Sequence, residues 1–202
     1  KVKYSEALYD VNNKKGNRNE MEGKVIKGIS DVYLMDGGSK REFQPLWFRT
    51  FRFIQLEITT KDEPLSIDEY YNVFSNSPVP AIASFKTDNP VYQQVWNICW
   101  HTMKLCAQDN LLSDAYYEQM QYVGDLRPHL MGWTALTGDL TYFRSAMEQF
   151  NNSRLPDGNI TSCYPLKASF VLPTYSLIWI DMLHDLMMLD GDKVLLESSR
   201  LL

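Results

Sequence analysis

The chain has 202 residues, of which 45% are apolar and 13% aromatic, enough to build one or two ordinary cores. Its net charge of −5 and sequence pI of about 5.2, with no run of Lys and Arg and no ladder of basic and aromatic residues, argue against nucleic acid as a partner. No apolar run is long enough to span a membrane. The sequence opens at Lys1 without Met or signal peptide and ends inside a helical pattern, so we interpret it as a processed or partial chain. The missing signal peptide therefore does not indicate whether the protein is exported.

Residues 1–84 show the pattern of a β-domain. Two short apolar runs, 24–26 and 32–35, are separated by clusters of turn-forming residues, and the second run leads into Asp36-Gly37-Gly38, a hairpin signal. The strongest strand pattern lies between Phe43 and Thr60, where the alternation changes phase after Phe53, as at a bulge. These features predict a β-sandwich, or part of one.

Helical patterns follow a proline-rich boundary, which predicts a second domain over residues 85–202. Asp88 or Asn89 is expected to cap a helix from about 90 to 107, and because this helix is apolar nearly all round it should be largely buried. Later helices are predicted from Asp125, as the capping residue, to Gly138, from Asp139 or Thr141 to Phe150, from 174 to 189, and from 192 onward. The irregular stretch 151–173 is long for a compact domain and is typical of a functional loop.

The cysteines predict neither a disulfide framework nor a metal site. They are three in number, at positions 99, 106 and 163. The spacing of Cys99, His101 and Cys106 matches no zinc pattern, and Cys99 and Cys106 lie seven apart on one helix face, so we interpret them as buried thiols. No cofactor and no metal is predicted, and His184 is interpreted as an ordinary helical histidine.

The densest cluster of chemically versatile side chains lies in residues 113–125. It contains three acids and three tyrosines, namely Asp114, Glu118, Asp125, Tyr116, Tyr117 and Tyr122. An aromatic ring offers an apolar face to a pyranose, carboxylates accept hydrogen bonds from sugar hydroxyls, and glycoside hydrolysis uses a pair of carboxyl groups. The alternative is a polar loop whose acids cap helices and whose tyrosines cover a neighbouring helix.

The run Tyr-Tyr-Glu-Gln-Met-Gln-Tyr-Val-Gly-Asp over residues 116–125 resembles the catalytic signature of α-L-rhamnosidases of glycoside hydrolase family 78. The resemblance implies that Glu118 is the general acid and that Tyr122 and Asp125 line the rhamnose pocket. Further sugar-binding candidates are Asp114, Tyr117 and Arg127. The nearby charges of Asp114 and Asp125 are expected to raise the pKa of Glu118.

The start of the motif departs from the family pattern. The family usually begins with Asp-Cys-Pro, whereas this chain reads Ser113-Asp114-Ala115. A gapless alignment places Ser113 at the family's Asp, and a shift of one residue places Asp114 there. We favour Asp114.

The resemblance also implies an architecture and a mechanism. It predicts a jelly-roll β-sandwich followed by the first helices of an (α/α)6 barrel, an α+β multidomain organisation, whereas the residue pattern alone supports an all-α domain after a β-domain. The implied enzyme is inverting, acts on a rhamnose-containing glycoside or polysaccharide, and takes its general base from a Glu beyond position 202. We therefore expect this chain alone to be inactive, and the intact enzyme to be periplasmic or secreted; no oligomeric state is predicted.

Two other classes of function remain open from the sequence. The chain could be a non-hydrolytic carbohydrate-binding or structural fragment, which the mass of the native protein would reveal. It could also belong to a different (α/α)6 enzyme, such as a glucuronyl hydrolase or another exo-glycosidase, which a panel of nitrophenyl glycosides would distinguish.

Overall fold

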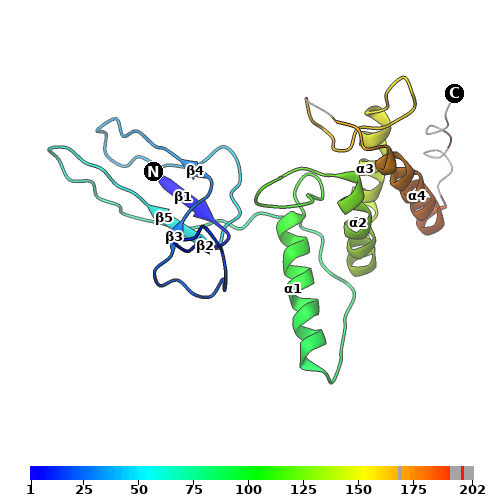
Figure 1. Cartoon of the computed structure of the whole chain (residues 1–202), viewed down its shortest axis with the longest axis horizontal. Coiled ribbons are helices and arrows are strands. Elements are labelled where there is room, and N and C mark those ends of the chain that lie inside the picture. The colour runs from blue at the N-terminus through cyan, green and yellow to red at the C-terminus, as the bar shows by residue number, and fades with distance from the viewer. Residues whose placement is uncertain (168–169, 192–196, 198–202) are drawn as a thin grey trace. The chain divides into compact units, whose positions relative to one another are not determined.

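The computed structural model describes residues 1–167, 170–191 and 197, and divides the chain into two compact units, Lys1–Val73 and Phe74–Leu202 (Figure 1). Small sheets occupy the first unit and helices the second, so the chain is α+β, as predicted. The predicted domains, 1–84 and 85–202, and the jelly-roll and barrel architectures stay predictions. The helix expected from residue 192 onward falls almost wholly outside the described residues.

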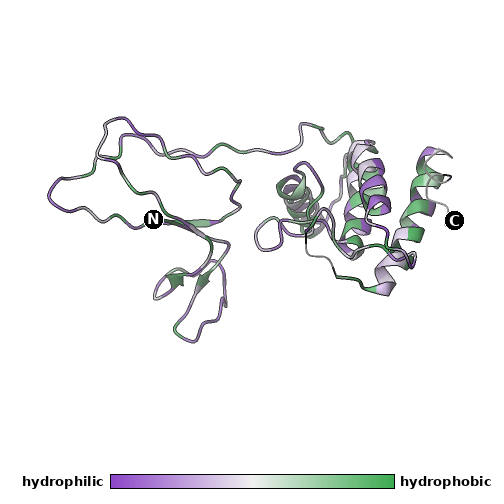
Figure 2. Cartoon of the chain, turned by 90° about the horizontal axis from the view of Figure 1, so that it is seen from above, coloured by the Kyte–Doolittle hydropathy of each residue, from purple (hydrophilic) through white to green (hydrophobic). Residues whose placement is uncertain are grey.

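The first unit contains two small antiparallel sheets. Strand β1 (Val2–Ser5) lies between β4 (Ser30–Asp31) and β5 (Phe53–Leu56), and β2 (Leu8–Tyr9) pairs with β3 (Val25–Ile26). In the β1–β5 pair, Val2 lies opposite Leu56 and Ser5 opposite Phe53. Long irregular connections join these short strands, and hydrophobic residues are scattered along the connections as well as in the strands (Figure 2).

Two strand predictions in this unit need correction. Residues 32–35 form no strand; the pairing ends at Asp31, and the following turn is held by the Asp36 carboxylate, which accepts from the Gly38 N–H at 2.9 Å and binds the Arg41 guanidinium. The long pattern from Phe43 to Thr60 yields only β5 (Phe53–Leu56), because only these residues lie beside β1. The predicted bulge is absent from this strand, because Phe53 and Ile54 pair with Ser5 and Tyr4 in unbroken register, although both side chains are half-buried.

The second unit is built on four helices, α1 (Pro90–Cys106), α2 (Val123–Thr137), α3 (Thr141–Asn152) and α4 (Pro173–Asp190). The predicted start of α1 is confirmed, because Asn89 Oδ1 accepts from the Val91 N–H at 3.0 Å and Pro90 follows in the first turn. Gly138 ends α2 in the left-handed conformation, with φ of 72°. At α3, Thr141 is the first residue, and Asp139 Oδ1 accepts its N–H at 3.0 Å.

The predicted start of α2 is wrong by three residues, because the capping residue is Tyr122 and not Asp125. The helix begins at Val123, and Tyr122 occupies the capping position without a side-chain cap, so Asp125 lies within the first turn instead of preceding it. The cause is a backbone pairing of Tyr122 with Cys163, which holds Tyr122 extended and lets the helix begin directly after it. Pro128 consequently lies inside the helix, where it has no N–H to donate to the carbonyl of Gly124.

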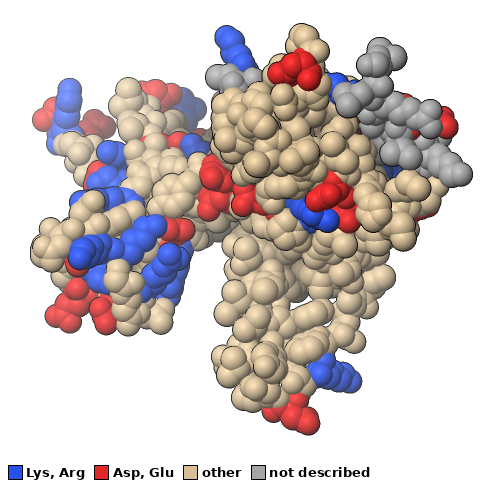
Figure 3. All heavy atoms as spheres, turned by 45° about the vertical axis from the view of Figure 1, so that its right-hand side comes forward, with Lys and Arg blue, Asp and Glu red and all other residues tan. Residues whose placement is uncertain are grey.

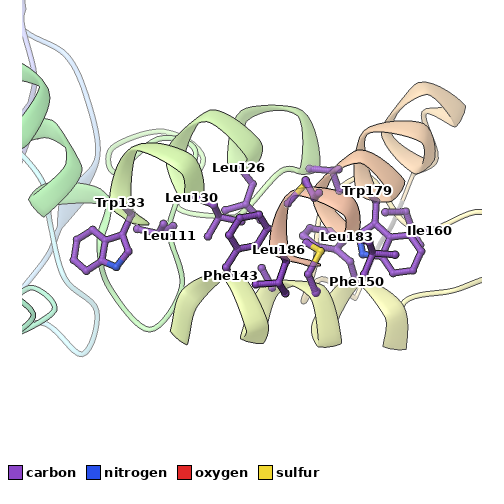
Figure 4. Close-up of a cluster of buried hydrophobic side chains, with 14 of the residues drawn as sticks. Leu111, Leu126, Leu130, Trp133, Phe143, Phe150, Ile160, Trp179, Leu183 and Leu186 are labelled. Atoms are coloured by element: carbon purple, nitrogen blue, oxygen red, sulfur yellow. The ribbon is translucent and has the colours of Figure 1, made fainter. Parts of the chain in front are cut away.

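The core of the second unit is a cluster of large apolar side chains between α2, α3 and α4 (Figure 4). Its fully buried members include Leu126, Leu130, Trp133, Phe143, Phe150 and Met182. Helix α4 packs against both α2 and α3. The loops before α2 and before α4 add Leu111 and Ile160 to the same cluster, so both loops are fixed to the core.

The prediction that α1 is largely buried is wrong. Cys106 is its only buried residue, while Val91, Val95 and Ile98 are at least half exposed. Only the second half of the helix reaches the core, where the rings of Trp100 and Trp133 lie 6.1 Å apart. Cys99 is therefore exposed, contrary to prediction, whereas Cys106 and Cys163 are buried as expected for thiols; all three are free.

Candidate active site

The acidic and aromatic motif forms a closed loop between α1 and α2. Ser113 closes it in two ways: its N–H donates to the Met120 carbonyl at 2.9 Å, and its hydroxyl oxygen accepts from the Tyr122 N–H at 2.9 Å. Leu111, Leu112 and Tyr116 are buried beneath the loop. Glu118 lies in the loop that leads into the N-terminus of α2 and not within a helix.

Asp114 holds the turn that carries Glu118. Its Oδ1 accepts hydrogen bonds from three successive backbone N–H groups, those of Tyr116 (2.7 Å), Tyr117, and Glu118 (3.3 Å). The Asp114 carbonyl also accepts from the N–H of Gln119, which has a φ of 48°. Both Ser113 and Asp114 therefore shape the loop, and the sugar-binding role of Asp114 stays a prediction.

The electrostatic environment of Glu118 favours its protonated form. Although Glu118 is exposed as a whole, partial burial is the largest cause that raises the pKa of its carboxyl, and the charges of Asp125 and then Asp114 raise it further. The predicted direction of this shift is confirmed, with partial burial as a cause in addition to the two acids. A carboxyl group with a raised pKa can retain its proton at a higher pH and act as an acid.

A second loop, described at residues 153–167 and 170–172, is attached to the far end of the motif. The Val123 N–H donates to the Ser162 carbonyl at 3.1 Å, and the Tyr164 N–H donates to the Gln121 carbonyl at 3.4 Å. The ring of Tyr122 lies 6.3 Å from that of Phe170, and partial burial, Cys163 and the charge of Glu118 raise the Tyr122 pKa. The long irregular stretch is thus packed beside Tyr122.

A chain of hydrogen-bonded amide side chains links the motif to α3. Gln121 is buried, and its Nε2 donates to Gln149 Oε1 of α3 at 2.7 Å. Gln149 Nε2 in turn donates to Asn110 Oδ1 at 2.9 Å. This chain connects both ends of the loop to α3.

Arg127 is engaged in ion pairs. Its Nε donates to Asp185 at 2.8 Å and its NH1 to Asp181 at 2.9 Å, so the guanidinium ties α2 to α4. A direct role of Arg127 in sugar binding stays a prediction. Nearby, His184 Nδ1 lies 3.8 Å from Asp185 Oδ1.

Tyr175 is a member of the site that the sequence did not reveal. Burial is the largest cause that raises its pKa, and the charges of Asp125 and Glu118 raise it further. The ring lies against Gly124, far away in the sequence, and no local pattern predicts that contact.

Within residues 1–167, 170–191 and 197, no cluster of three or more His, Cys, Asp or Glu side chains could hold a metal ion. The same residues contain no helix that is both long and apolar enough to cross a membrane. The helical unit carries more acidic than basic side chains, and the view in Figure 3 shows acidic groups on its surface with few basic ones among them.

The candidate site is thus a carboxyl-bearing loop on a helical scaffold. Residues 80–199 match the family described as bacterial alpha-L-rhamnosidase 6 hairpin glycosidase domain, and since this match covers more than half of the chain, the chain belongs to that family. The resemblance found in the motif is thereby confirmed.

A solved structure agrees at the level of the fold. The 1.9 Å crystal structure of a GH78 family rhamnosidase of Bacillus sp. GL1 superposes with a TM-score of 0.54 at 23% sequence identity. The match covers 58% of this chain and 12% of that protein, so this chain spans a small part of the relative's length. No curated protein sequence matches the chain.

Proposed function

We propose that the protein to which this chain belongs is a glycoside hydrolase that releases terminal α-L-rhamnose from rhamnosides, with Glu118 as the general acid. The observation that carries this proposal is the placement of Glu118: a fixed loop presents it at the surface, and partial burial and two neighbouring acids raise its pKa. The family match over residues 80–199 supports the same class of reaction.

In the proposed mechanism, the protonated Glu118 carboxyl donates its proton to the glycosidic oxygen as the bond to the sugar breaks. A second carboxylate, roughly 6.5–9.5 Å away in inverting enzymes, activates water on the opposite face of the ring. We assign this base to a part of the protein outside these 202 residues. The fixed loop and the raised pKa of Glu118 support its assignment as the acid.

The other motif residues are proposed to hold the sugar. Asp125 is exposed in the first turn of α2, and its charge reaches Glu118, which suits an acceptor for sugar hydroxyls. Tyr122 and the exposed Tyr117 offer ring faces, and the Tyr117 ring stands edge-on to that of the buried Tyr116, 4.6 Å away. Asp114 and Arg127 complete the proposed set. A polysaccharide substrate would place the enzyme in the periplasm or outside the cell.

The stereochemistry of the product tests the proposal. The complete protein is incubated with an aryl α-L-rhamnoside, and proton NMR follows the first sugar released. β-Rhamnose as the first product supports an inverting rhamnosidase. α-Rhamnose as the first product contradicts the inverting mechanism, and no release of rhamnose from any rhamnoside contradicts the function.

A further inference from the structure

The close contact between Tyr175 and Gly124 joins two helices at the proposed site. A Cβ atom placed on Gly124 would lie 2.8 Å from Cζ of Tyr175 and 2.9 Å from both Cε1 and the phenol oxygen. These separations are shorter than real Cβ contacts, so any side chain at this position would displace the ring. Gly124 lies within α2, so the close approach of the ring, and not a left-handed backbone, requires the glycine.

Tyr175 is held firmly where it is. It lies in the first turn of α4, its N–H donates to the Leu172 carbonyl at 2.8 Å, and its ring packs against the buried cluster. The next residue, Ser176, fixes the start of the helix to the preceding loop, because its hydroxyl accepts from the Ile160 N–H at 3.1 Å and donates to Asn159 at 3.1 Å. The ring therefore has little freedom to move away from Gly124.

The phenol hydroxyl is a hydrogen-bond donor that lies against Gly124, the residue before Asp125 in the motif. Burial, Asp125 and Glu118 raise its pKa, so it keeps its hydrogen at neutral pH. Within the described part of the chain it makes no hydrogen bond. The strongest alternative donor, the Arg127 guanidinium, is already paired with Asp181 and Asp185.

A sugar hydroxyl both donates and accepts hydrogen bonds, so a sugar site needs donors as well as acceptors. The carboxylates at this site supply acceptors. We propose that Tyr175 is a further sugar-binding residue of the site, that its phenol hydroxyl donates a hydrogen bond to a hydroxyl of the bound sugar, and that residue 124 is glycine in order to admit it. This inference rests on the proposed function.

The first test is Tyr175→Phe in the complete protein, assayed on an aryl α-L-rhamnoside. The variant keeps the ring against Gly124 and loses only the hydroxyl. We expect KM to rise about 2- to 10-fold, the usual effect of one neutral hydrogen bond, with kcat changed less than about twofold. Tyr142→Phe is the matched control: its hydroxyl bonds the Gln108 carbonyl, so that variant should lose thermal stability and keep its KM.

An unchanged KM in Tyr175→Phe overturns the inference while leaving the function intact, provided that the wild-type protein releases rhamnose. If the wild-type protein releases no rhamnose, the proposed function fails and this inference fails with it. The two failures are therefore distinguishable.

The second test is a double-mutant cycle on the contact itself. Gly124→Ala should raise KM at least as much as Tyr175→Phe, because the new methyl group displaces the ring. In a Tyr175→Ser background the obstacle is gone, so Gly124→Ala should add no further change. Gly132→Ala is the control on the same helix, since its Cβ would meet only the flexible end of Met103 at 3.2 Å. Equal effects of Gly124→Ala in both backgrounds would overturn the proposed role of the glycine.

Discussion

Residues 1–73 bury only Tyr4, Ser5 and Ala7, whereas the helical unit buries a continuous apolar cluster that extends from Ala107 to Leu186. The difference does not come from a shortage of apolar residues, since Leu34, Leu46 and Trp47 of the first unit are all more than half exposed. It comes from element length. Strands of two to four residues present little surface, while helices of 12 to 18 residues offer faces that can cover one another.

Charge separates the two units as well. Residues 1–73 carry equal numbers of acidic and basic side chains, so the whole net charge of −5 belongs to residues 74–202. A carboxylate raises the pKa of a neighbouring carboxyl group because two like charges repel. The charges of Asp125 and Asp114 act on Glu118 in this way. A negatively charged surface also suits a neutral sugar better than an anionic one.

The largest expected effect is on catalysis, and only a substitution in the helical unit should produce it. Glu118→Gln keeps the size of the side chain but removes the acidic proton, so turnover of a natural disaccharide should fall ~10²–10⁴-fold. An activated aryl rhamnoside, whose leaving group needs less protonation, should lose less. The matched control is Glu20→Gln in the first unit, where Glu20 accepts from Asn17 and lies near Lys24. Wild-type turnover of the disaccharide by Glu118→Gln would refute the assignment.

Replacing one tryptophan in each unit compares how much packing contributes to stability in the two units. Trp133 is fully buried, and Trp133→Ala should lower the free energy of unfolding by about 3–5 kcal/mol. Trp47 is 55% exposed, and Trp47→Ala should change it by no more than about 0.5 kcal/mol. Denaturant unfolding followed by circular dichroism measures both. Equal losses would mean that the first unit relies on exposed aromatic residues for its stability.

Two aspartates that hold turns provide the next comparison. Asp114→Ala removes the acceptor of three backbone N–H groups and should cost about 0.5–2 kcal/mol of stability, together with activity, because the turn carries Glu118. Asp36 holds a turn in the first unit through one backbone N–H and is exposed, so Asp36→Ala should lower the thermal midpoint less than Asp114→Ala does. If Asp114→Ala retains both stability and turnover, the turn does not depend on this carboxylate.

The smallest expected effects are opposite pH dependences of stability. The Asp36 pKa is lowered, chiefly by Arg41, so its contribution to stability is present above the unfolded pKa and is lost as pH falls through the folded pKa. The Glu118 pKa is raised, so the folded state loses stability as pH rises from the unfolded pKa through the folded one. Relative to wild type, Asp36→Asn should therefore be less stable, and Glu118→Gln more stable, at neutral pH than at acidic pH. Thermal midpoints measured across acidic to neutral pH test both signs, and the same sign for both would contradict the assigned environments.

Local rules predicted much of the helical framework. Asn89 and Pro90 begin α1 and Gly138 ends α2 because capping depends on neighbouring residues only. The start of α2 was misplaced because Tyr122 is held extended by Cys163, a partner distant in the sequence. The exposure of α1 could not be predicted for a similar reason, since an apolar face shows that burial is possible but not which element supplies it.

The candidate site likewise contains residues that the sequence predicted and residues that only the tertiary structure reveals. Glu118 and its acidic neighbours lie within one short motif, so their charges predicted the direction of the Glu118 pKa shift, but not the partial burial that is its largest cause. Tyr175 lies on another helix, and only the three-dimensional packing against Gly124 brings it to the site. The ion pairs of Arg127 with α4 likewise depend on tertiary structure.

The chain of amides that joins the motif to α3 has a consequence for how related sequences can diverge. The buried Gln121 donates to Gln149, and Gln149 donates to Asn110; both of these partners are half-buried. Replacing Gln121 alone would leave the Gln149 carbonyl oxygen without its donor, at a cost of about 1–3 kcal/mol. Substitutions at these positions should therefore be inherited together: an apolar residue at 121 would be tolerated mainly in sequences that have also lost the amide at 149.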